Sequence, residues 1–149
     1  MEIPDWLIKV APSAFSAVVG YFVGGWRERK QHRSRQLGER VKETCGLIDG
    51  ISDKACKYWA NCNAPESRLL GQEIVADLHR ATRTRLLCAE FDPRFDFQMF
   101  CDLDDEFSEL VTGGDFQSAN AVPDLEKANK IRTVATNFVI CLKKEYDFL

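Results

Sequence analysis

An apolar run close to the amino terminus is the feature that most limits how this chain can fold. It reads WLIKVAPSAFSAVVGYFVGGW, from Trp6 to Trp26. As an α-helix, this run would be about 30 Å long, which matches the hydrocarbon core of a bilayer. A tryptophan at each end suits the headgroup region, and Lys9 lies close enough to one end to reach outward. The run therefore predicts one membrane-spanning helix over residues 6–26. The alternative is a buried helix of a soluble protein.

Charged residues on the two flanks of this run set its predicted orientation. The preceding segment, residues 1–5, carries Glu2 and Asp5, whereas residues 27–36 form a basic collar. The basic residues of the collar are Arg27, Arg29, Lys30, Arg33 and Arg35. Positive charge is enriched on the cytoplasmic side of membrane helices. We therefore expect a single-pass protein of the inner (plasma) membrane, with its N-terminus outside. The collar should contact anionic lipid headgroups of the bilayer.

Small residues are spaced four apart along one face of the predicted span. They are Ser16, Gly20 and Gly24, and the last two form a GxxxG pattern. Such a face lets two helix backbones approach closely in lipid, where van der Waals packing drives association. It favours a homo-oligomer that associates through the span. The alternative remains that small residues are simply common in membrane helices.

Residues 37–149 carry four stretches of helical apolar periodicity. The first stretch has steps that alternate between four and three, which is typical of one buried helix face. Its members are Leu37, Val41, Thr44, Ile48, Ile51, Ala55, Tyr58 and Cys62. This helix can continue from the span through the collar to about Asn61. Its stripe would serve either a coiled coil between copies or a bundle within one copy. The bundle is favoured because the rest of the chain supplies partner helices.

Three further helices are predicted from turn signals and periodicity. The second begins near Pro65 and ends at about Phe91, before Asp92-Pro93. The third covers about Phe95 to Val111 and stops at a glycine pair, and the fourth follows Pro123 and reaches about Tyr146. The predicted buried residues are Leu70, Ile74, Leu78, Ala81, Leu87 and Cys88 in the second helix, Met99, Phe100, Leu103, Phe107 and Leu110 in the third, and Leu125, Ala128, Ile131, Val134 or Ala135, Phe138, Cys141 or Leu142, and Tyr146 in the fourth. The predicted fold is all-α, with a transmembrane helix continuing into a cytoplasmic antiparallel four-helix bundle.

Charge content argues against a nucleic-acid partner for the bundle, and cysteine content against disulfides or a zinc site. From residue 37 onward there are 14 Lys or Arg against 20 Asp or Glu, a net charge of −6. Nucleic-acid binding needs a basic face, so we expect none. The six cysteines, none in a CxxC pair, fall in helical apolar patterns. A cytoplasmic location predicts reduced, buried thiols rather than disulfides or a zinc site.

Two charged clusters form a candidate partner surface. Arg80, Arg83 and Arg85 lie late in the second helix, and Asp102, Asp105 and Glu109 share a face of the third. The arginines could pair with these acids across the hairpin, hold an anionic ligand, or simply be solvated. The acids come from a single helix, and oxygen-ligand metal sites draw on several elements, so we expect neither a metal nor a cofactor.

One glycine-rich loop, Thr112-Gly-Gly-Asp-Phe116, invites comparison with phosphate-binding loops. A true phosphate loop needs a strand before it and a Lys-Ser or Lys-Thr after it, and neither is present. We therefore interpret it as a helix stop with Phe116 as an anchor.

No motif in the chain has the residues of an enzyme signature, so we predict no catalytic activity. The leading hypothesis is a membrane protein whose cytoplasmic domain binds or senses a protein partner while the span self-associates. A membrane-acting toxin or phage-defence effector would be one version of it. The alternatives are a passive anchor for a soluble enzyme complex and a membrane-tethered enzyme acting on an anionic substrate.

Overall fold

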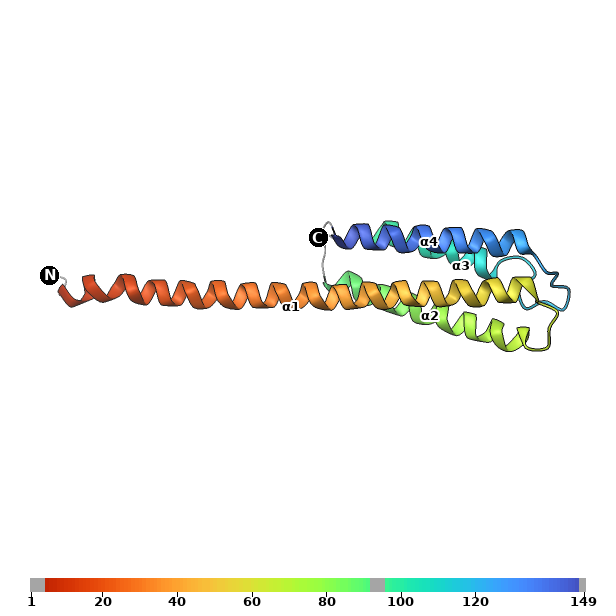
Figure 1. Ribbon diagram of the computed structural model, residues 1–149. Helices are drawn as coiled ribbons and strands as arrows, with labels where there is room; N and C mark the ends of the chain where they lie inside the picture. Colours follow the sequence, from red (N-terminus) through yellow and green to blue (C-terminus); the bar gives the residue numbers. More distant parts are fainter. Residues whose placement is uncertain (1–4, 92–95, 148–149) are drawn as a thin grey trace. The chain divides into compact units, whose positions relative to one another are not determined.

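The computed structural model describes the backbone of residues 5–91 and 96–147. It describes the side chains of the same residues except 5–24, 29, 30, 85, 88–91 and 97. Within this described part, the secondary structure consists of four helices: α1 (Asp5–Ala60), α2 (Ser67–Phe91), α3 (Phe97–Thr112) and α4 (Leu125–Asp147) (Figure 1). The prediction of an all-α chain is confirmed. The chain divides into two units, residues 1–36 and residues 37–149.

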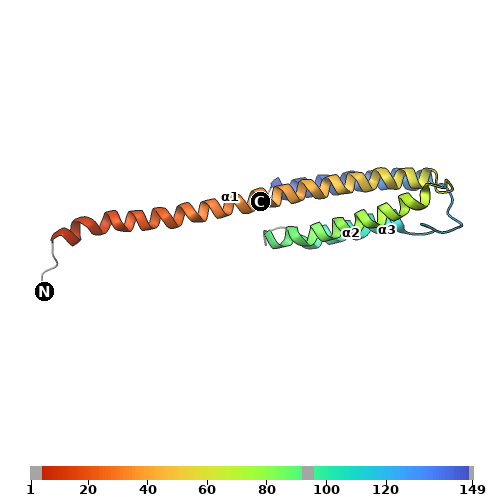
Figure 2. The same ribbon diagram turned by 90° about the horizontal axis from the view of Figure 1, so that it is seen from below.

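The second unit is a four-helix bundle. Residues 37–60 of α1 lie beside α2 and α4, α3 lies beside α2 and α4, and successive helices run in opposite directions (Figures 1 and 2). An ion pair of 2.8 Å between Lys54 Nζ and Asp77 Oδ2 joins α1 to α2. The thiol of Cys56 donates to the carbonyl oxygen of Ala128 at 3.1 Å, which joins α1 to α4. The predicted helical bundle is therefore formed by the four helices of one chain.

The apolar stripe predicted on α1 forms a large part of the hydrophobic core. Seven of its eight members are buried, each with at most 4% of its surface exposed: Leu37, Val41, Thr44, Ile48, Ile51, Ala55 and Tyr58. The eighth, Cys62, follows the end of the helix and is half-buried. A stripe with alternating steps of four and three stays on one side of an α-helix, so all seven face the neighbouring helices.

Aromatic side chains fill the space between α3 and α4. Phe100, Phe107 and Phe138 are at most 1% exposed. The ring of Phe138 meets those of Phe100 and Phe107 edge-on, with centroids 5.2 and 6.2 Å apart. Such edge-to-face contacts add to the free energy gained by burying the rings.

Helix ends follow local capping chemistry. The carboxylate of Asp96 accepts the N–H of Met99 at 2.9 Å and caps α3. At its other end, the N–H of Gly113 donates to the carbonyl oxygen of Glu109 at 2.7 Å. The glycine pair therefore stops α3 as predicted, one residue later than expected. Helix α2 begins at Ser67, two residues after Pro65, because residues 61–66 form turns.

The predicted inner position of Leu125 is wrong, since this side chain is 67% exposed. Leu125 is the first residue of α4, and α1 already ends at Ala60. The backbone N–H of Asp124 donates to the carbonyl oxygen of Trp59 at 2.8 Å, so α4 starts level with the end of α1. The apolar pattern of α4 thus begins where α1 ends, and its first position is left exposed.

The cysteines are less uniformly buried than predicted. The free thiol of Cys45 is buried, and burial raises its pKa. The other free cysteines that the structure describes are half-buried: Cys56, Cys62, Cys101 and Cys141. The side chain of Cys88 lies outside the described residues. Core packing therefore accounts for one of these thiols fully and for the others in part.

Most of the predicted membrane segment lies outside the side chains that the structure describes. This holds for its contact face, Ser16, Gly20 and Gly24, and for Arg29 and Lys30 of the collar. Their backbone belongs to α1. Within the part of the chain that the structure describes, no helix has both the length and the apolarity needed to cross a bilayer.

Candidate functional site

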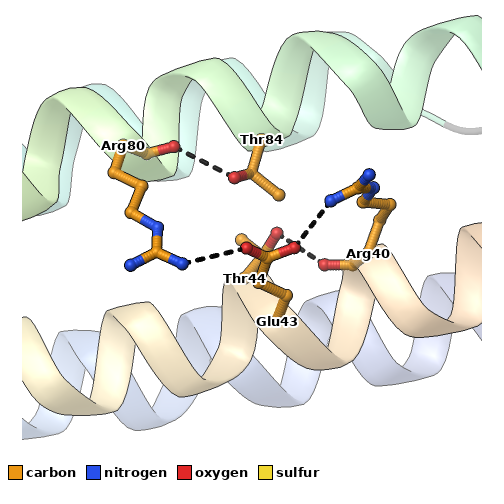
Figure 3. Close-up of polar contacts among 5 residues, drawn as sticks. All are labelled: Arg40, Glu43, Thr44, Arg80 and Thr84. Atoms are coloured by element: carbon orange, nitrogen blue, oxygen red, sulfur yellow. Dashed lines mark hydrogen bonds and ion pairs between the residues drawn. The ribbon is translucent and has the colours of Figure 1, made fainter.

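The structure divides the predicted charged surface rather than joining its two halves. The guanidinium of Arg80, on α2, lies 3.3 Å from the carboxylate of Glu43 on α1 (Figure 3). The suggestion that it pairs with the acids of α3 is therefore wrong. The reason is its place on α2, where its side chain turns toward α1 (Figure 3).

Glu43 is the centre of what we call the arginine cluster, made of Arg40, Glu43 and Arg80. Its second carboxylate oxygen accepts from Arg40 at 2.8 Å, one turn earlier on the same helix. The side chains remain 42%, 33% and 62% exposed, respectively. At that exposure, water screens the ion pairs, so each contributes little to the free energy of unfolding.

Two buried threonines lie next to the arginine cluster, between α1 and α2 (Figure 3). The hydroxyl of Thr44 donates to the carbonyl oxygen of Arg40 at 2.8 Å, and that of Thr84 to the carbonyl oxygen of Arg80 at 3.0 Å. Each hydroxyl is therefore satisfied within its own helix, which is how a threonine is commonly accommodated inside a bundle.

The predicted acids of α3 line its outer surface. Asp102, Asp105 and Glu109 are exposed, and Asp102 accepts from the side-chain amide of Gln98 at 2.8 Å. On α2, Arg83 is exposed, and the side chain of Arg85 lies outside the described residues. Asp102, Asp105 and Glu109 on α3 and Arg83 on α2 are therefore exposed charged residues on two helices.

Asp104 lies between Asp102 and Asp105 in the sequence but is buried, with 5% of its surface exposed. It accepts from the hydroxyl of Thr82 on α2 at 3.4 Å. Its spacing from Phe100 and Phe107 is four and three residues, which places it on the apolar stripe of α3. This spacing could have predicted that Asp104 is buried, but the acids next to it in the sequence made it look like part of an exposed face.

A second cluster lies where α1, α3 and α4 meet, and we call it the loop-end cluster: Tyr58, Trp59, Phe116 and Lys127. The ring of Phe116 lies 4.8 Å from that of Tyr58, centroid to centroid. The Tyr58 hydroxyl accepts the backbone N–H of Gln117 at 2.6 Å. The indole N–H of Trp59 donates to the carbonyl oxygen of Val111 at 3.0 Å. Phe116 thus anchors the glycine loop, as predicted.

Lys127 closes the loop-end cluster from the first turn of α4. Its Nζ lies 3.6 Å from the centre of the Trp59 ring and donates to the carbonyl oxygen of Gly113 at 2.7 Å. Burial lowers the pKa of this amine, while the charges of Asp124 and Asp115 act in the opposite direction. A cation against an aromatic face that is partly shielded from water is a stronger contact than an exposed ion pair.

An open hollow of about 410 Å³ lies beside Lys127. Its walls are Glu106, Glu109, Leu110, Gly113, Gly114 and Lys127. Sequence analysis missed Trp59 and Lys127 because their environment is created by residues 113–124 folding back onto α1. No local pattern reports such a contact.

A second open hollow, of about 400 Å³, lies at the start of α2 and includes Lys57, Leu69 and Glu73 in its walls. Over the residues that the structure describes, no three His, Cys, Asp or Glu side chains gather in a way that could hold a metal ion.

Comparison with protein-family models, with curated proteins and with solved structures finds no match to this chain.

Proposed function

We propose that this protein is a single-pass membrane protein that acts by binding a partner protein. Residues 6–26 span the inner membrane with the N-terminus outside, and residues 37–149 present the four-helix bundle to the cytoplasm. The span associates with the spans of other copies. The protein has no catalytic role in this proposal.

The observation that carries the proposal is the join between the apolar run and the basic collar. Trp26, the last residue of the run, is 67% exposed, and Arg27, Arg33 and Arg35 are exposed as well. Tryptophan is enriched where hydrocarbon meets headgroups, and arginine just beyond that point on the cytoplasmic side. This order of exposed residues supports a helix that leaves the membrane at Trp26.

The bundle supports a binding role because its polar groups are turned outward. The acids of α3 and the arginine at position 83 are exposed on different helices, and the bundle carries a net charge of −6. A charged, patterned surface favours rapid and selective encounter with a protein of complementary charge. The partner would therefore present a basic surface to α3.

Membrane insertion is tested by expressing the full chain in bacterial cells and extracting the membranes with alkaline carbonate. We expect the protein to stay in the pellet. Replacing Val18 and Val19 by Asp should move it to the supernatant, because each charge at the centre of a membrane helix costs about 2.5–3.5 kcal/mol. Val122→Asp, on an exposed residue of the bundle, is the matched control. Release of the unaltered protein by carbonate would contradict the proposal.

Association through the span is tested by changing Gly20 and Gly24 to Ile. Bulky side chains keep the backbones apart, so crosslinking between copies in the membrane should fall several-fold. Gly25→Ile is a suitable control because it lies off the GxxxG spacing. If crosslinking is unchanged while the protein remains in the pellet, the copies do not associate through the GxxxG face, and this part of the proposal fails separately from insertion.

A further inference from the structure

We propose that Lys127 is an acylation site, at which an acyl thioester or acyl phosphate modifies the amine and loosens the junction of α1, α3 and α4. This inference uses contacts within the bundle alone. It is therefore independent of the membrane function proposed above.

Access to the amine comes from the neighbouring glycine. Gly114 is exposed and lines the same hollow as Lys127. A Cβ atom built at Gly114 would lie 3.9 Å from Lys127 Nζ. Because glycine has no side chain, the amine is left open to a small reagent in the hollow. The backbone of Gly114 has a φ of +70°, which glycine adopts readily.

Burial lowers the pKa of this amine below that of an ordinary lysine. Burial against Trp59 disfavours the ammonium and lowers the pKa of Lys127. Two carboxylates oppose that effect, those of Asp124 at the cap and Asp115 in the loop. Glu106 and Glu109 also lie on the wall of the hollow. The balance still lowers the pKa, so more of the amine is neutral at a given pH than in an ordinary lysine.

Lys130, one turn further along α4, provides an internal contrast. Its Nζ pairs with Glu126 at 2.8 Å and is exposed. Hydrogen bonding to that carboxylate raises the pKa of Lys130. The two amines share a helix and a chain, yet the pKa is lowered at Lys127 and raised at Lys130.

The chemical step is an ordinary acyl transfer. The lone pair of neutral Nζ attacks the carbonyl carbon of the donor, forming a C–N bond. The C–S bond of a thioester, or the C–O bond of an acyl phosphate, then breaks, and the thiolate or phosphate leaves with the bonding pair. Nζ releases one proton to water. The product is a neutral amide.

Loss of the charge weakens the loop-end cluster. An amide has no positive charge to place over the Trp59 ring, and the added acyl group displaces Nζ from the carbonyl oxygen of Gly113. The first contact joins α4 to Trp59 of α1, and the second joins α4 to Gly113 at the start of the loop of residues 113–124. Acylation should therefore free this loop and alter the surface that α3 and the loop present to a partner.

The first test is the rate of acylation at individual lysines. The full chain in detergent micelles is incubated with acetyl phosphate, and acetylation is measured over time by peptide mass spectrometry. We expect Lys127 to react several-fold faster than Lys130. Gly114→Asn tolerates the backbone conformation and covers the amine, so it should slow Lys127 several-fold and leave Lys130 unchanged. Equal rates in the unaltered protein, or an unchanged rate at Lys127 in the variant, would overturn the site.

The second test asks whether the modification loosens the junction. Hydrogen exchange at residues 113–124 is compared between the unmodified and the acetylated protein, and in Lys127→Gln and Lys127→Arg. We expect faster exchange after acetylation and in the Gln variant, whereas the Arg variant keeps the charge and should stay near the unmodified rate. Unchanged exchange after acetylation would overturn the structural effect. Neither result depends on whether the chain enters a membrane.

Discussion

Two clusters of side chains join α1 to its neighbours in the bundle, and they differ in how far water is excluded from them. In the arginine cluster, the charged groups of Arg40, Glu43 and Arg80 are between 33% and 62% exposed. In the loop-end cluster, the indole of Trp59 is only 3% exposed, and its N–H and its ring face both have partners. The first cluster consists of ion pairs in water, and the second of polar contacts around a buried aromatic core.

This difference indicates which contacts hold the bundle together. A buried hydrogen bond that loses its partner leaves an unsatisfied group, whereas an exposed charge that loses its partner is solvated again. Stability should therefore depend strongly on the loop-end cluster and weakly on the arginine cluster. The exposed cluster remains free to exchange its contacts with those of a binding partner.

The largest effect is expected for Trp59→Ala. The substitution leaves a cavity at the junction of α1, α3 and α4 and removes the partners of Val111 and Lys127. We expect the free energy of unfolding to fall by about 3–5 kcal/mol. The measurement is urea unfolding of the full chain in mild detergent, followed by circular dichroism. Trp26→Ala, at a 67% exposed tryptophan, should change it by less than about 0.5 kcal/mol. A loss below about 1 kcal/mol for Trp59→Ala would remove the contrast between the clusters.

The periodicity of the sequence was sufficient to predict the helices and most of the core. On α1, each step of the stripe from Leu37 to Tyr58 leads to a buried residue, because residues on one helix face meet the same neighbours. The pattern failed at Leu125, which is the first residue of α4 and is exposed at the end of the bundle. Periodicity reports which face is apolar, but the positions of other helix ends decide whether that face is covered.

The site was less predictable than the fold. Asp104 could have been found from its place on the stripe of α3. Trp59 could not, because it lies beside the stripe and is covered only when the loop folds back. The depressed pKa of Lys127 depends on the same non-local contact, since burial against Trp59 causes it. The contact of Arg80 with Glu43 was not among the predicted alternatives, because sequence spacing does not reveal which neighbouring helix a charged side chain will face.

The smallest effect is expected for Glu43→Gln, which removes the charge at the centre of the arginine cluster and keeps the shape of the side chain. The free energy of unfolding should fall by less than about 1 kcal/mol, because both arginines remain hydrated. The difference from the unaltered protein should shrink further in about 1 M salt, where the screening length is about 3 Å. Glu39→Gln, one turn earlier on α1 and exposed, is the matched control and should be close to neutral. A salt-independent loss comparable to that of Trp59→Ala would show that the ion pairs are buried in solution. It would then place the arginine cluster in the core of the bundle rather than on a surface open to a partner.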